Sequence, residues 1–408
     1  MDKVSGAVEA FVSLLVLVAM ALLWAGCAFA SDLSLHGFLQ GNYSANTAEE
    51  NPDGGDFKWA EERVQLKLEG NRDPYHLFIK TDVFYDHIDD DSDAEIREGY
   101  ADYTADKWDL RLGRQVITWG IGDLIFINDV FPKDYEAFYA GRPMEYLKKG
   151  VDGLKVGLYP RAANLDVVLI PFFEGNTLPR QGRFHNSMNP EAEEPDVTLE
   201  NTEAALRAYR NLKGSDASLY YYKGFFRTPS MTANGSFFYP ELSVFGASAE
   251  GRAAGGILGV EAGYYDSRED RRGDNPSVPN SSSRLMLAYK RQLMEDFNIG
   301  LQYYTEYMLK YSRYETSLPS GYAKEDRLYQ LATLRLTRML LHQDLTLSLF
   351  VFYSPSDGDH TMNPEAKYKF TDNVWAAVGG SVFGGNSGGR FGRLGRNDNA
   401  YLQMRYEF

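Results

Sequence analysis

Cysteine and histidine are scarce in this sequence. Its 408 residues include one cysteine, Cys27, and six histidines, of which no two are four positions apart. A chain with one cysteine cannot form an internal disulfide or a Cys-x-x-Cys-His haem attachment. The sequence also lacks the paired histidines of a helical zinc motif. We therefore expect no disulfide, no cofactor and no metal centre of these kinds, and the chain is not itself a c-type cytochrome.

Basic residues and long apolar runs are also few. The chain has 42 Lys and Arg against 57 Asp and Glu, a formal net charge of −15. This balance argues against a nucleic-acid partner. From residue 31 onward no run approaches the roughly 20 apolar residues of a membrane-spanning helix. If the mature chain resides in a membrane, it must do so as a closed β-barrel.

The first 30 residues have the features of a secretory signal peptide. Lys3 is followed by an apolar stretch over 10–24 and by Ala-Phe-Ala at 28–30. This pattern predicts cleavage after Ala30, so that the mature domain spans 31–408. Residues 23–27 loosely resemble a lipoprotein box, which leaves lipidation of Cys27 as the alternative. The favoured cleavage removes that cysteine.

The last nine residues alternate between apolar and polar side chains and end in Phe408. In a strand, successive side chains face opposite sides, so one face suits lipid and the other water. The segment resembles the closing-strand signal of Gram-negative outer-membrane barrels, which the barrel-insertion machinery reads. An ordinary edge strand is the alternative. The resemblance implies contact with outer-membrane lipid and lipopolysaccharide.

Similar alternation recurs along the chain, and the segments between the predicted strands are alternately short and long. Short connections at 72–74 and 213–215, for example, precede longer ones at 87–93 and 229–239. Counting the segments gives about eighteen strands, or about sixteen as the alternative, with both termini on the periplasmic side. Tyrosine is abundant, with 28 residues, as expected for the interfacial girdles of such a wall. We predict an all-β fold, a single transmembrane antiparallel barrel in the bacterial outer membrane.

The long connection 119–150 is the segment with the clearest functional signal. It contains the apolar run 124–131, which an exposed loop would rarely hold. We expect this loop to fold into the lumen and narrow the pore, where charges of both signs would create a transverse field. A solvated external loop or a protein contact is the alternative. The predicted constriction residues are Asp123, Asp129, Lys133, Asp134, Glu136 and Arg142.

A family resemblance covers about 25 residues here. Residues 111–120 read Arg-Leu-Gly-Arg-Gln-Val-Ile-Thr-Trp-Gly, and 127–135 read Ile-Asn-Asp-Val-Phe-Pro-Lys-Asp-Tyr, with Asp123 between them. This is similar to a pattern in an uncharacterised porin-like group of outer-membrane proteins related to the alginate-export barrels. The resemblance implies a barrel of about eighteen strands and transport of solutes or polysaccharide, and it does not fix the substrate.

The alternation of side chains along each predicted strand, here called strand parity, indicates which charged residues face inward. Basic residues outnumber acidic ones on the predicted inner face although the chain is acidic, so we hypothesise a mild preference for anions. A register shift of one residue would reverse part of this count. The predicted lumen residues are Arg63, Lys67, Lys80, Asp82, Arg97, Arg111, Lys155, Arg284, Arg335 and Arg405.

Two further groups of residues are weaker candidates for a functional site. Asp89, Asp91 and Asp93 offer oxygen ligands for Ca²⁺, but they lack the spacing of a calcium loop, so a solvated turn is favoured. His87 and His360 follow aspartates at predicted strand ends, which keeps a barrel protease or lipase open as an alternative without a supporting motif.

The sequence thus predicts a non-enzymatic, porin-like channel for passive diffusion of small hydrophilic solutes, with no catalytic residue. The alternatives are a polysaccharide export barrel, a sleeve for an electron-transfer cytochrome, and the barrel enzyme.

Overall fold

The structure is a computed structural model that describes residues 33–48, 55–185, 190–232 and 234–408. The predicted signal segment 1–30, including Cys27, lies outside the described residues, so its cleavage and the alternative of lipidation remain predictions. Within the described residues, no helix is both long and apolar enough to cross a bilayer.

Eighteen antiparallel strands form one closed sheet. The strands are β1 (Leu33–Asn46), β2 (Phe57–Arg72), β3 (Tyr75–Asp86), β4 (Asp91–Thr104), β5 (Trp108–Gln115), β6 (Val151–Leu158), β7 (Asn164–Ile170), β8 (Glu203–Leu212), β9 (Ser215–Phe225), β12 (Glu241–Ala253), β13 (Gly256–Ser267), β14 (Ser282–Met294), β15 (Phe297–Met308), β16 (Leu328–Leu340), β17 (Leu345–Ser354), β18 (Asp359–Lys369), β19 (Val374–Gly385) and β20 (Asn399–Glu407).

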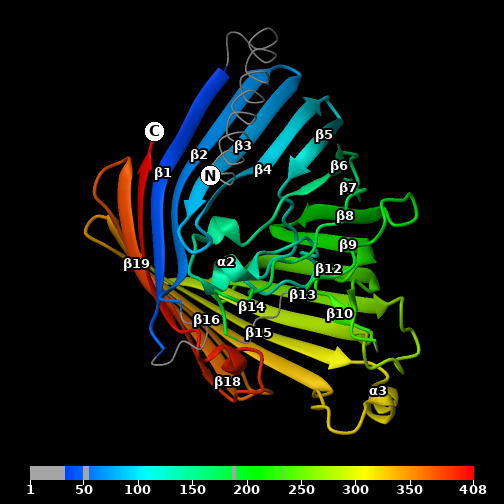
Figure 1. Cartoon of the computed structure of the whole chain (residues 1–408). Coiled ribbons are helices and arrows are strands. Elements are labelled where there is room, and N and C mark those ends of the chain that lie inside the picture. The colour runs from blue at the N-terminus through cyan, green and yellow to red at the C-terminus, as the bar shows by residue number, and fades with distance from the viewer. Residues whose placement is uncertain (1–32, 49–54, 186–189, 233) are drawn as a thin grey trace, which may run out of the picture.

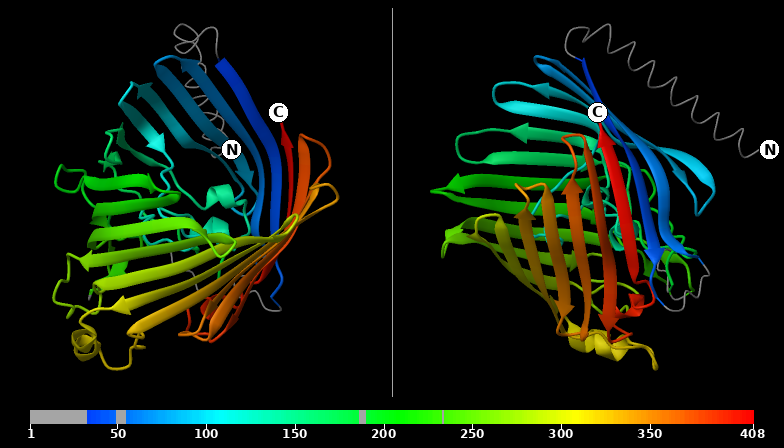
Figure 2. Two further views of the ribbon diagram at one scale, coloured as in Figure 1. Left: turned by 180° about the vertical axis from the view of Figure 1, so that it is seen from behind. Right: turned by 90° about the vertical axis from the view of Figure 1, so that its left-hand side faces the viewer.

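The barrel closes where the last strand meets the first. β20 pairs with β19 on one side and with β1 on the other, in a register that runs from Phe38 opposite Glu407 to Asn46 opposite Asn399. Figures 1 and 2 show β1 and the C-terminal strand side by side. The predicted fold class, strand number and closing strand are confirmed.

Side chains alternate between the two faces of the wall as the period of two requires. In β20, Leu402 and Met404 are each 57% exposed on the outside, whereas Tyr401 and Gln403 are 7% and 2% exposed on the inside. The outer face of the barrel is largely apolar and includes many exposed leucine and tyrosine side chains. Such a face suits lipid.

The two ends of the barrel differ in their connections. At one end, here called the turn end, tight turns join the strands, and those at 213–214 and 254–255 have positive φ at both residues, as type I′ hairpin turns require. The opposite end, here called the loop end, has the longer loops, notably 116–150, 171–202, 226–240, 268–281, 309–327 and 386–398. Long and short connections alternate as the sequence predicts.

Small elements lie within these loops. Loop 116–150 contains α2 (Tyr135–Tyr139) and a 3₁₀ turn at Met144–Tyr146. A hairpin of β10 (Ser230–Met231) and β11 (Phe237–Phe238) lies in 226–240, α3 (Tyr311–Ser317) in 309–327, and a 3₁₀ turn (Gly392–Leu394) in 386–398. Figure 1 shows α2 inside the ring of strands.

The hydrophobic core lies inside the barrel. Apolar residues of loop 116–150 pack there against inward side chains of the wall, so the apolar run that the sequence singled out is buried in the lumen. The cluster includes Ile125, Ile127, Val130 and Phe131 from the loop and Val168, Tyr265, Met286 and Phe352 from the wall.

Candidate functional site inside the barrel

Loop 116–150 seats in a recess of the inner wall that glycine residues create. Gly246 on β12 and Gly263 on β13 lie opposite each other in the sheet. A Cβ atom at Gly263 would lie 2.6 Å from Ile127 Cγ2, and one at Gly246 would lie 1.6 Å from Asn128 Oδ1. The loop can approach the wall this closely because these two positions lack side chains.

Two inward polar side chains bind the backbone of residues 121–128 of this loop, here called the seated segment. Glu261 on β13 accepts hydrogen bonds from the backbone N–H groups of Ile121 and Asn128, each at 2.8 Å. Gln302 on β15 accepts one from the N–H of Asp123 and donates one to its carbonyl oxygen, both at 2.7 Å. The wall therefore fixes the backbone around Asp123 from two strands.

Asp129 and Lys133, two predicted constriction charges, are packed against each other. Lys133 Nζ lies 2.9 Å from Asp129 Oδ1, and both side chains are nearly inaccessible to solvent. Lys148 Nζ reaches the other carboxylate oxygen at 3.2 Å. A buried pair of this kind would leave an uncompensated charge if one partner were removed. These residues fasten the loop and do not face an open passage.

Asp134 and Glu136 hold the short helix α2 in place. The Asp134 side chain caps the helix by accepting a hydrogen bond from Ala137 N–H at 2.8 Å. Glu136 is buried and accepts the backbone N–H of Arg180 at 2.7 Å. Burial raises the pKa of Glu136 from its ordinary 4.5 to about 7, against the opposing effect of this hydrogen bond and of nearby arginines.

Arg142 lies between two aromatic rings. Its guanidinium carbon is 4.3 Å from the ring centroid of Trp59 and 4.0 Å from that of Tyr146, and Nη2 is 3.3 Å from Glu61 Oε1. Stacking and ion pairing together fasten this part of the loop to β2. Of the six predicted constriction residues, only Asp123 borders the cavity described below.

The same loop also contacts the strand that closes the barrel. Asn399 Nδ2 donates to the carbonyl oxygen of Tyr139 at 2.9 Å, and Gln403 Nε2 donates to that of Gly141 at 2.6 Å. Both amide side chains are 2% exposed. The loop that follows β5 therefore spans the lumen to β20.

Two further loops enter the barrel, and the sequence reasoning missed both. In loop 171–202, Arg183 is 2% exposed and forms an ion pair with Asp86 at the end of β3. In loop 386–398, Phe391 is buried and its ring lies 5.5 Å from that of Phe352. The buried aromatics Phe184 and Phe391 were the available signal, because the burial argument used for 124–131 applies to them as well.

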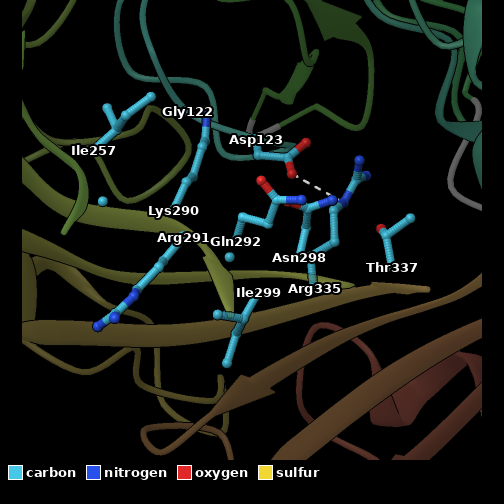
Figure 3. Close-up of a pocket in the computed structure, with 12 residues that line it drawn as sticks. Gly122, Asp123, Ile257, Lys290, Arg291, Gln292, Asn298, Ile299, Arg335 and Thr337 are labelled. Atoms are coloured by element: carbon cyan, nitrogen blue, oxygen red, sulfur yellow. Dashed lines mark ion pairs between the residues drawn. The ribbon is translucent and has the colours of Figure 1, made fainter. Parts of the chain in front are cut away.

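A cavity of about 620 Å³ lies beside the seated segment, near the turn end. Within it, Asp123 Oδ2 lies 2.9 Å from Arg335 Nε on β16. Lys290 on β14 also borders the cavity and forms no ion pair with any described residue. Figure 3 shows Lys290, Asp123 and Arg335 on one side of the strands, whereas Arg291 and Ile299 point the other way. The polar neighbours in the lining are Gln292, Asn298 and Thr337.

The structure places the predicted lumen residues on the inner face, but they differ in accessibility. Arg63 and Asp82 form an ion pair in which both side chains are almost fully buried. Other members of the set donate to loop carbonyl oxygens, as Arg97 does, or pair with loop carboxylates, as Arg405 does with Glu145. Those that keep more solvent contact include Lys67, Lys80, Arg111, Lys155, Arg284 and Arg335.

Two accessible members near the turn end, Lys67 and Arg111, are paired with acids. Lys67 lies 3.2 Å from Glu69, and Arg111 binds Asp102 through two hydrogen bonds of 2.7 and 2.9 Å. His76 bridges the two acids, with contacts of 3.3 and 3.0 Å. This part of the inner wall is therefore close to electrically balanced.

Arg114 and Asp152 form an ion pair at 2.7 Å. They lie opposite each other on β5 and β6 and share the outer face with Leu112 and Leu154.

The aspartate run after β3 makes local contacts. Asp89 is paired with Arg180 and Arg183, while Asp91 and Asp93 accept the backbone N–H groups of the residues that follow them. In the part of the chain that the structure describes, no three metal-ligating side chains come together. Asp89 is therefore engaged by arginines and not arranged for a cation.

The barrel matches solved outer-membrane proteins over almost its whole length. OccAB3 of Acinetobacter baumannii is 9% identical, with a TM-score of 0.58, over 93% of this chain and 99% of that chain. OccK2 (OpdF) of Pseudomonas aeruginosa, solved in complex with glucuronate, is 10% identical, with a TM-score of 0.60, over 92% and 98%. The fold is that of a porin. OccD3 (OpdP) of Pseudomonas aeruginosa is 11% identical, with a TM-score of 0.59, over 93% and 91%.

No family model and no curated relative matches the sequence. At these identities the likeness shows the porin fold alone. The activity must therefore be argued from the residues inside the barrel.

Proposed function

We propose that this protein is an outer-membrane, porin-like channel through which small hydrophilic solutes diffuse, and that it prefers anions. The observation that carries the proposal is the seated loop, which lies across the lumen and places Asp123 against Arg335 at a cavity of about 620 Å³ that Lys290 also borders. The largely apolar outer face would contact lipid and lipopolysaccharide, and the strand that ends in Phe408 would serve the insertion machinery.

The preference for anions rests on the charges around that cavity. Arg335 and Lys290 supply two positive charges and Asp123 one negative charge. Asp123 approaches Arg335 at Nε, so the two terminal nitrogens of this guanidinium remain directed away from that contact. Guanidinium and ammonium groups are the donors that bind carboxylates well. The neighbour OccK2 was solved with glucuronate, an anionic sugar, which is consistent with this preference.

The loops inside the barrel favour small solutes over the alternatives that need a wide lumen. The apolar run 124–131 would block a protein guest when inside the barrel and could bind one only from outside. Its position inside argues against a sleeve for a cytochrome. This run and loops 171–202 and 386–398 together occupy part of the lumen, which argues against passage of a polysaccharide.

The histidines at the loop end do not support an enzyme. His87 contacts the Glu62 carboxylate and lies near Tyr43 on the outside of the barrel. His360 lies on β18 opposite Tyr353, which is half exposed on the outer face. The two histidines therefore do not converge on one site, and we propose no covalent chemistry.

Solute uptake into proteoliposomes tests the proposal. Glucuronate, glucose and glucosamine share a ring and differ in charge, so their swelling rates separate charge from size. We expect the rate to fall in that order. The opposite order would refute the anion preference, and no swelling with any of the three would refute the channel.

A further inference from the structure

Glu261 is an inward residue of β13 with 0% exposure, and its carboxylate contacts the seated loop at four points. Oε2 accepts the backbone N–H groups of Ile121 and Gly122 at 2.8 and 3.2 Å. Oε1 accepts the backbone N–H and the side-chain Nδ2 of Asn128 at 2.8 and 2.9 Å. One side chain thus holds both ends of the segment 121–128.

All four contacts come from neutral donors. A carboxylate can accept at both oxygens, whereas an amide presents one acceptor and one donor group. Glutamine at position 261 would therefore turn N–H groups toward two of the donors that the loop presents. No ion pair with a basic side chain balances Glu261 within the described residues, so the carboxylate depends on the loop for its hydrogen bonds as much as the loop depends on it.

The segment that Glu261 holds carries the residue that borders the cavity. Asp123 follows Gly122 directly, and Leu124 has a φ of 62°, so the chain turns sharply within the segment 121–128. Gln302 contacts the backbone of Asp123 at this turn. The distance between Asp123 and Arg335 therefore depends on where Glu261 places the two ends of the segment 121–128.

We propose that Glu261 is the positioning residue of the channel, and that its carboxylate sets the width and the charge of the narrow region by holding 121–128 against β12 and β13. This inference rests on the proposed channel function. It assigns a role to a residue that touches no passing solute, since its side chain is fully covered by the loop.

Single-channel recording of Glu261→Gln in planar bilayers tests the role. We expect a higher mean conductance and more open-channel noise than in the wild type, because the loop loses two of its four contacts. Glu269→Gln is the matched control, since Glu269 is exposed in loop 268–281 just beyond the end of β13, and the substitution removes the same charge. Its conductance should equal that of the wild type.

A disulfide between the loop and the wall tests whether the change in conductance arises from the position of the loop or from a general loss of structure. Ile127 Cγ2 is one bond from Cβ and lies 2.6 Å from the Cβ position at Gly263, so cysteines at both sites would have Cβ atoms within about 4 Å, as a disulfide requires. Ile127→Cys and Gly263→Cys are added to Glu261→Gln. Oxidation should restore wild-type conductance, and reduction in the same bilayer should abolish the restoration.

The outcomes are distinct. A wild-type protein that does not conduct refutes the channel itself. A conducting wild type with an unchanged Glu261→Gln, or a disulfide that fails to restore conductance, refutes the role of Glu261 alone. If Glu261→Gln does not fold, as judged by heat-modifiable mobility on gels, Asn128→Ala replaces it, because this change removes one donor without altering the wall. We expect a smaller gain in conductance from Asn128→Ala, and no gain overturns the proposal.

Discussion

Replacing Lys290 by glutamine should shift the ion preference of the channel toward cations. Lys290 borders the cavity with Asp123 and Arg335, so the substitution reduces the formal charge of this group from one positive charge to zero. A unit charge acting on an ion at about 4 Å contributes about 1 kcal/mol in water, or roughly a fivefold change in local ion concentration. The anion should lose about this factor, and the cation should gain it.

The reversal potential in a KCl gradient measures this change. Screening weakens the effect at high salt, because the Debye length is about 10 Å at 0.1 M and shorter above it, so the recording belongs at low ionic strength. Asp123→Asn must shift the potential in the opposite direction. Lys213→Gln, which removes a charge from an exposed turn between β8 and β9, serves as the control. If Lys290→Gln and Lys213→Gln give the same potential, Lys290 does not face the ion path.

Three further predictions concern stability, measured by urea unfolding of the barrel in lipid vesicles. Leu349→Arg, on the outer face, should cost about 2–4 kcal/mol if the residue lies near the bilayer midplane, whereas Ser348→Arg, on the inner face, should cost far less; equal costs would contradict the assigned faces. Gly246→Ala should cost about 1–3 kcal/mol, because its Cβ would overlap Asn128, and an unchanged stability would show that the loop does not seat there. The pKa of Glu136 rises from 4.5 to about 7 on folding, so its contribution to stability is complete below pH 4.5 and is lost as the pH rises through about 7. Glu136→Gln should flatten this dependence, and an unchanged pH profile would refute it.

The barrel fold was predictable because the sequence features that indicate it are local along the chain. Strand parity and connection length survive in a single sequence, so the alternation over 400–408 and the contrast between a turn such as 213–214 and a loop such as 116–150 were enough to give the fold and the strand number. The burial of 124–131 inside the barrel followed from its apolar side chains, which need cover wherever they lie.

The contacts of the candidate site were not predictable in the same way. Glu261, Gln302 and Gly246 each occupy an unremarkable inward position of a strand, and each acquires its role from a loop that precedes it by more than a hundred residues. Parity gives the direction of a side chain but not its partner. For the same reason, Asp129 and Lys133 were assigned to an open gap although they bind each other.

The contacts between loop 116–150 and β20 have a consequence for the order of assembly. Gln403 and Asn399 lie on the strand that closes the barrel. The buried Gln403 amide donates to the carbonyl oxygen of Gly141 in that loop, and the Asn399 amide donates to that of Tyr139 in the loop and to that of Asn397. A barrel that closed with the loop still outside would leave the Gln403 Nε2 group without this acceptor, at a cost of about 1–3 kcal/mol, and Asn399 would lose one of its two acceptors. Closure of the barrel and insertion of the loop are therefore energetically coupled, so closure by β20 is more favourable when loop 116–150 already lies inside.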